Sequence, residues 1–121
     1  MGYLFAEETN RIICSFYNVY NHLGYGFLEK VYENALCQEL SELGVPISQQ
    51  ASVKVKYKGN IVGDYQCDLL VNEKIIVEIK AARNLLPDHD AQLLNYLKAT
   101  GLKVGLHLNF GPKPEVKRRI F

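Results

Sequence analysis

The chain has 121 residues, of which 48% are hydrophobic and 22% are charged. This composition is typical of a folded globular protein and excludes a disordered chain. Fourteen basic and thirteen acidic residues give a net charge of +1, so any binding of nucleic acid must use local charge or a metal ion rather than the charge of the whole chain. We expect a single domain over residues 1–121.

No apolar stretch approaches the roughly 18 residues that a membrane helix needs. The N-terminal sequence MGYLFAEETNR carries two glutamates where a signal peptide would be positively charged and then apolar. We therefore expect a cytoplasmic protein that does not contact a membrane.

Two helices are predicted in the first third of the chain. Apolar residues recur at helical spacing from about Glu7 to His22, and again from about Phe27 to Leu43. Gly24 and Gly26 interrupt the pattern, as glycines do just past the end of a helix.

The hydrophobic period then changes to two, which predicts three strands around residues 53–57, 61–71 and 75–80, with turns at residues 58–60 and 72–74. The third strand, IIVEIK, is almost continuously apolar, so we expect it at the centre of the sheet. A helix from about Asp88 to near Gly101 and a strand over residues 103–110 follow. The sequence predicts an α/β fold in the order α-α-β-β-β-α-β, with a mixed four-stranded sheet flanked by helices. The basic tail is either solvated or a further strand over residues 116–121.

The second and third strands bring acidic residues together. If residues 72–74 form a three-residue loop, Val71 pairs with Ile75. Asp68 then lies opposite Glu78 on one face, and Gln66 lies opposite Lys80. A two-residue loop would separate the two acids. The structural alternative for Glu78 and Lys80 is an ordinary ion pair at the end of a strand.

Two opposed carboxylates repel each other, and a divalent cation would remove this repulsion. Carboxylate oxygens suit Mg²⁺ or Mn²⁺, which also take water and substrate phosphate as ligands. Lys80 adds a point charge suited to a phosphate or to a nucleophilic water. Asp68, Glu78 and Lys80 therefore point to metal-assisted hydrolysis of phosphodiester bonds.

Residues on two helices could complete this site. Glu29 and Tyr32 share one face of the second helix, although Glu29 would also suit the helix dipole. His89, Gln92 and Tyr96 form one stripe of the third helix. Gln92 can position a phosphate or a base. Half-buried packing is the alternative for Tyr96, and a surface position at the helix start is the alternative for His89.

These residues carry a family resemblance. Asp68 followed by Glu78-Ile79-Lys80 resembles the D-(x)n-(D/E)-x-K signature of the PD-(D/E)XK nuclease superfamily, and the element order resembles its restriction-endonuclease-like core. The segment from Gln92 to Tyr96 is similar to the Q-x-x-x-Y motif of the RecB-type branch. The segment from Gly26 to Tyr32 matches the G-x-x-E-x-x-Y signature of the GxxExxY proteins. A cysteine precedes Asp68 where the superfamily often has proline.

The resemblance implies that Asp68 and Glu78 bind Mg²⁺ or Mn²⁺ with the carbonyl of Ile79, and that Glu29 binds or supports the metal. It also implies that Lys80 orients or activates the attacking water. Substrate contacts are expected from a separate set of residues: Tyr32, His89, Gln92 and Tyr96.

The leading hypothesis is a metal-dependent nuclease, with DNA as the expected substrate. The basic residues of the tail, Lys113, Lys117, Arg118 and Arg119, could contact phosphates. The alternative is a catalytically silent nuclease-fold module that binds nucleic acid or a protein. A third hypothesis is a homo-oligomer subunit that associates through aromatic residues, namely Tyr3, Phe5, Tyr17, Tyr20 and Tyr25.

Overall fold

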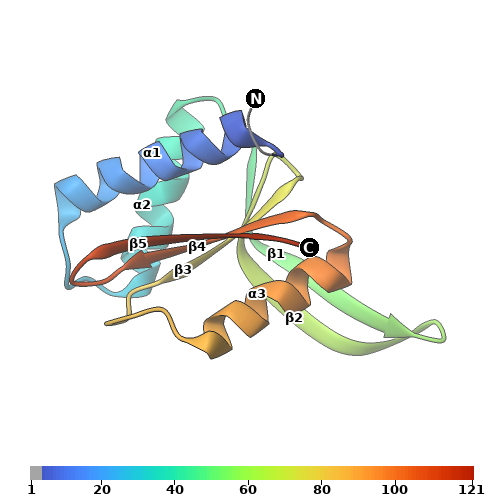
Figure 1. The fold of residues 1–121 in the computed structure, drawn as a ribbon. Coiled ribbons are helices and arrows are strands. Elements are labelled where there is room, and N and C mark those ends of the chain that lie inside the picture. The colour runs from blue at the N-terminus through green and yellow to red at the C-terminus, as the bar shows by residue number, and fades with distance from the viewer. Residues whose placement is uncertain (1–3) are drawn as a thin grey trace.

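The computed structural model describes residues 4–121. The elements are α1 (Ala6–Leu23), α2 (Glu29–Glu42), β1 (Ile47–Tyr57), β2 (Asn60–Val71), β3 (Ile75–Lys80), α3 (Pro87–Thr100), β4 (Val104–Phe110) and β5 (Pro114–Ile120). The strands form one sheet in the order β1-β2-β3-β4-β5 (Figure 1). β3 and β4 are parallel, and the other neighbouring strands are antiparallel. The mixed α/β fold is confirmed, but the sheet has five strands instead of the predicted four.

The fifth strand lies in the basic tail. Pro114–Ile120 pairs antiparallel with β4 from Pro114 opposite Phe110 to Ile120 opposite Val104. Every residue of β4 is buried, because β3 and β5 flank it and helices pack on both of its faces. Prolines and a run of charged residues interrupt the alternation of apolar and polar residues that would indicate this strand in the sequence. Of the two predictions for the tail, the strand is correct, and it begins two residues earlier than expected.

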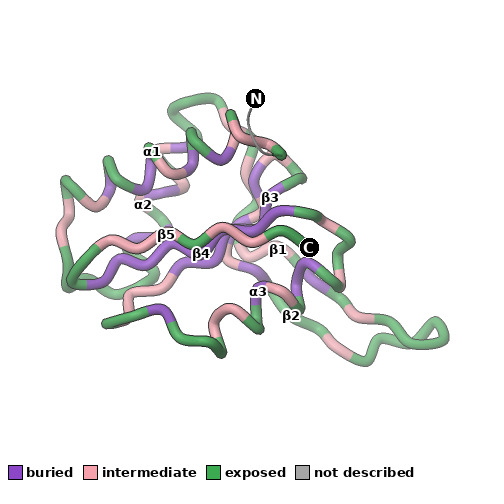
Figure 2. The backbone as a smooth tube through the Cα atoms, in the orientation of Figure 1, coloured by how far each residue is buried: buried purple, intermediate pink, exposed green. Residues whose placement is uncertain are grey.

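The helices cover both faces of the sheet. α1 and α2 lie on one face and α3 on the other (Figure 1). The larger apolar core joins α1 and α2 to the sheet, and a smaller cluster joins α3 to it. Buried residues concentrate along β3 and β4 (Figure 2), which confirms that IIVEIK is a central strand. Within residues 4–121, no helix is long and apolar enough to cross a membrane.

The aromatic residues considered as an oligomer surface differ in exposure where the structure describes them. Tyr17 and Tyr25 are exposed, and Phe5 is half-buried. Tyr20 instead donates a hydrogen bond from its hydroxyl to the carbonyl of Gly111 at 2.7 Å. Tyr3 lies outside the described residues.

The side chains of β2 do not alternate regularly between the two faces of the sheet along the whole strand. Leu69 and Val71 pack in the core under α1 and α2, whereas Cys67 packs in the cluster under α3. Regular alternation would place Cys67 and Leu69 on the same face. The change occurs at Asp68, where the β1–β2 pairing is interrupted opposite Gln50, whose φ is 54°. Cys67 and Leu69 therefore lie on opposite faces of the sheet.

Two hydrogen bonds from Asn109, near the end of β4, hold the segment that follows β3. The side chain of Asn109 accepts from the amide of Ala82 and donates to its carbonyl, both at 2.9 Å. Gly111 packs against the Asn109–Ala82 contact, which we call the clamp, and a Cβ on Gly111 would collide with the carbonyl oxygen of Ala82.

We expect Gly111→Ala to lower the free energy of unfolding by about 1–3 kcal/mol, because the added methyl group forces the backbone to move. Urea unfolding measures the change. The exposed neighbour offers a control, since Pro112→Ala adds no atom at this contact. Equal stability of Gly111→Ala and the wild type would show that the clamp tolerates displacement.

Candidate active site

The strands β2 and β3 separate at a fork that holds two acidic residues. Their ladder starts with Val71 opposite Ile75, which confirms the predicted three-residue loop, and it ends at Leu69 opposite Val77. Beyond it, the amide of Asp68 donates to Oε2 of Glu78 at 2.6 Å, and the amide of Ile79 donates to Oδ2 of Asp68 at 2.7 Å. The two carboxyl groups thus take the place of the next pair of backbone bonds.

The pairing of β2 with β3 does not continue to Lys80. Gln66 is paired with Ser52 on β1, and no pair joins it to β3. The predicted opposition of Gln66 and Lys80 is therefore wrong, because β2 leaves β3 at the fork and follows β1.

Burial controls the charge at the fork. Glu78 is 2% exposed; its burial and the charge of Asp68 raise its pKa to about 8. Burial also raises the pKa of Asp68, although the hydrogen bond from the Ile79 amide opposes this change. A buried carboxyl group beside a second, half-buried one favours either a retained proton or a bound cation.

The donor chemistry of the fork fits a hard divalent cation. Within residues 4–121, no group of three or more His, Cys, Asp or Glu side chains is arranged to hold a metal ion. Magnesium sites commonly use one or two carboxylates and complete their shell with water and substrate oxygens. Asp68 and Glu78 supply the two carboxylates that such a magnesium site needs.

Helix α2 brings two more acids to the fork. Burial raises the pKa of Glu29, the nearby Lys80 lowers it, and Asp68 raises it. The charges of Asp68 on β2 and Lys80 on β3 therefore both act on the carboxyl group of Glu29. A hydrogen bond from the amide of Ala81 also favours its charged form.

The second acid of α2, Glu33, was missed by the sequence reasoning. It is 4% exposed and accepts hydrogen bonds from Lys30, Gln49 and Gln50 at 2.5–3.0 Å. Burial alone would raise the pKa of Glu33, but these bonds lower it. Gln50 also reaches Oδ1 of Asp68 at 3.5 Å. The signal was available, since Glu33 follows Glu29 by one helical turn.

A chain of polar side chains runs from β3 to α3. Lys80 donates from Nζ to Oε1 of Gln92 at 3.3 Å, and Gln92 donates from Nε2 to the hydroxyl of Tyr96 at 3.0 Å. Tyr96 is 3% exposed and packs against Tyr65, whereas Gln92 is exposed. The buried Tyr96 thus holds the side chain of the exposed Gln92 in place through this hydrogen bond.

Tyr32 does not occupy the substrate-contacting position expected for it. The residue is fully buried, and its ring stacks on Phe110 with centroids 4.3 Å apart. Its hydroxyl donates to the carbonyl of Gly24 at 2.6 Å and accepts from the amide of Phe27 at 3.1 Å. We correct its role: Tyr32 fixes the loop that precedes Glu29.

Two histidines approach each other beside Lys80. Nδ1 of His89 accepts from the amide of Leu86 at 3.1 Å, at the start of α3. Its ring centroid is 6.3 Å from that of His107, which lies beside Glu78 in the parallel ladder. His107 is 1% exposed, and burial lowers its pKa to about 4. The sequence analysis missed His107, whose signal is one polar residue in the apolar run VGLHLNF.

A family model described as the PD-(D/E)XK nuclease superfamily matches residues 6–119. The chain belongs to the PD-(D/E)XK nuclease superfamily. Nucleases of this superfamily generally require a divalent metal and act on nucleic acid. Asp68 and Glu78, two of the residues that carry the resemblance in the sequence, meet at the fork.

Solved structures share the fold of this PD-(D/E)XK chain. The crystal structure of SSO0001 has a TM-score of 0.61 and 17% identity, over 96% of this chain and 59% of SSO0001. An alkaline exonuclease from Laribacter hongkongensis has a TM-score of 0.56 and 12% identity, over 99% of this chain and 72% of the exonuclease. The chain therefore spans less than two thirds of the length of SSO0001. A search among curated proteins gave no match.

The raised pKa of Glu78 predicts how stability depends on pH. The folded state holds a proton on Glu78 up to about pH 8, whereas the unfolded chain loses it near 4.5. The folded state therefore binds more protons between these values, and its stability falls as the pH rises through them. In the presence of a chelator, we expect Glu78→Gln to reduce this fall by on the order of 3 kcal/mol.

Urea unfolding of both proteins at pH 5 and pH 8.5 measures this difference. Glu73→Gln is a suitable control, because Glu73 is exposed in the β2–β3 turn. Parallel pH curves for the wild type and Glu78→Gln would contradict the predicted protonation.

Proposed function

We propose that this chain is a metal-dependent nuclease that hydrolyses phosphodiester bonds of DNA at the fork between β2 and β3. The observation that carries the proposal is the pair of reciprocal hydrogen bonds that brings Asp68 and Glu78 together. The charge of Lys80 acts on both acids. Superfamily membership supports the same reaction class.

In this proposal, Asp68, Glu78 and the carbonyl of Ile79 hold Mg²⁺ or Mn²⁺, and Glu29 binds or supports the metal from α2. When bound, the cation would polarise the scissile phosphate and lower the pKa of a coordinated water. Glu33 is a positioning residue, because it reaches Asp68 through Gln50.

Lys80 orients the attacking water or contacts the phosphate. Its ammonium group is held by Gln92, which is itself held by Tyr96. Gln92 is exposed and is the proposed substrate contact of this chain of side chains. His89 is a second proposed contact, since it stands at the start of α3 with its ring 6.3 Å from that of His107; burial and then the charge of Lys80 lower its pKa.

We also propose a finer placement within the superfamily, with the GxxExxY proteins and the RecB-type branch. Gly26, Glu29 and Tyr32 support the first placement. Gln92 and Tyr96 support the second, since the motif places them one turn apart and their side chains bond to each other.

The first test is cleavage of DNA and RNA substrates with Mg²⁺ or Mn²⁺. We expect Asp68→Ala and Lys80→Ala each to reduce cleavage by at least about a hundredfold, because each removes charge from the reacting centre. Lys74→Ala is the control, since Lys74 lies in the turn at the closed end of the β2–β3 ladder. Equal cleavage by all variants would indicate a contaminating nuclease. Absence of cleavage by the wild type would favour the silent binding module.

The second test measures metal binding without turnover. Magnesium at about a hundred times its Kd should stabilise the wild type by roughly 2.7 kcal/mol, which raises Tm by about 10 °C. We expect no such shift in Asp68→Asn, which keeps the shape of the side chain but loses its charge. Asp64→Asn, an exposed aspartate on the same strand, controls for nonspecific effects. Equal shifts in all three proteins would place the metal elsewhere.

A further inference from the structure

The hairpin of β1 and β2 extends away from the rest of the protein (Figure 1). We call residues 53–64 the hairpin arm. Val53 is buried against α3 at its base. None of the eleven residues from 54 to 64 is buried, and nine of them are exposed, because β3 pairs only with Leu69–Val71. Tyr57, Ile61 and Val62 are each more than half exposed at its end.

The turn of the hairpin arm contains a lysine in a costly conformation. Tyr57 pairs with Asn60, so Lys58 and Gly59 form a two-residue turn. Both have positive φ, 49° and 82°. Turns of this kind favour asparagine before glycine, and other side chains in this region cost about 1–2 kcal/mol. Local stability therefore does not explain a lysine at this position.

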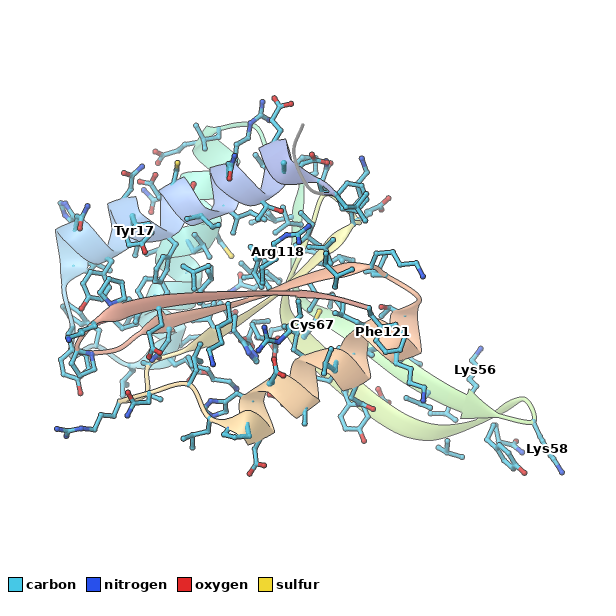
Figure 3. All side chains as sticks on the ribbon, viewed as in Figure 1. Tyr17, Lys56, Lys58, Cys67, Arg118 and Phe121 are labelled. Carbon is cyan, nitrogen blue, oxygen red and sulfur yellow. The ribbon has the colours of Figure 1, made fainter. Side chains whose placement is uncertain are left out.

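Positive charge dominates the hairpin arm. It contains Lys54, Lys56 and Lys58, and its only acid is Asp64, which pairs with Lys54 at 3.3 Å. Lys56 and Lys58 project from the far end of the arm (Figure 3). At the base, a hollow of about 430 Å³ between the arm and α3 adds further polar groups, including those of Asn95 and Lys98.

The hairpin arm is continuous with the candidate active site through β2. Asp68 follows Asn60 by eight positions, a span of about 26 Å at roughly 3.3 Å per residue. This span equals the rise of about eight base pairs of duplex DNA, at roughly 3.4 Å each. A two-stranded ribbon is also narrow enough to enter a major groove about 12 Å wide.

We propose that the hairpin arm binds the phosphate backbone of a double-stranded nucleic acid, about eight base pairs from the point where the fork engages it. The inference deepens the proposed function and rests on it for the position of the scissile bond. Charge complementarity favours this occupant, because three lysines and one aspartate lie in the arm, and among residues 4–121 the arm's ion pair joins Asp64 to Lys54 and not to Lys56 or Lys58.

The test is binding of a labelled 24-base-pair duplex in a chelator, so that cleavage does not interfere. We expect Lys58→Asn to weaken binding while Tm stays level or rises, because asparagine suits the turn. Combining it with Lys56→Gln should reduce the slope of log K against log salt by about two. Asp64→Asn should tighten binding, since it releases Lys54. Lys74→Gln, at the opposite end of β2, should change little.

Several outcomes would overturn the proposal. One is unchanged affinity and salt dependence in the Lys56→Gln, Lys58→Asn double variant. Another is an equal loss of affinity for the single strand of the same sequence, which would assign the arm to single strands. A changed mass in solution would assign it to a second copy of the chain. If these variants lose duplex binding while the wild type cleaves nothing, the hairpin arm is supported and the proposed function fails.

Discussion

Two hydrogen bonds between carboxyl groups and backbone amides hold the fork on which the candidate site depends. A buried amide without a partner costs about 1–3 kcal/mol, so β2 and β3 could not separate at Asp68 unless something replaced their ladder. The carboxyl groups of Asp68 and Glu78 provide that replacement. They also bring the buried Glu78 next to the half-buried Asp68, and close acids out of water either bind a cation or retain a proton.

The motif around Glu29 is explained by the loop that precedes α2. Gly26 has a φ of 122°, which side chains rarely adopt. Tyr32 bonds to Gly24 and Phe27 and stacks on Phe110 of β4. The glycine permits the loop, and the tyrosine attaches it to the core. Glu29 begins the helix between them and is thereby directed toward Asp68 and Lys80.

The sequence was sufficient for the parts of the fold that follow local rules. The three-residue loop set the β2–β3 register, and the apolar run IIVEIK identified the central strand. The switch of faces at Asp68 could not be predicted, because it depends on the left-handed conformation of Gln50 on a neighbouring strand. Tyr32 shares a helical face with Glu29 in a simple projection. Its ring stacks on Phe110, which lies 78 positions further along the chain. A pattern within the helix does not predict a contact between residues so far apart in the sequence.

The order of the strands has a consequence for how the protein acquires its acid cluster during folding. All neighbouring strands are consecutive in the chain, and only β3 and β4 need a helical crossover, so most strand pairs can form from nearby segments at little cost in loop entropy. The β2–β3 hairpin alone carries Asp68 and Glu78, but Glu29 and Glu33 arrive only when α2 docks. Lys80 acquires its Gln92 partner only when α3 docks. A nascent or partly folded chain therefore lacks the assembled group, and the complete constellation forms only in a chain that has finished folding.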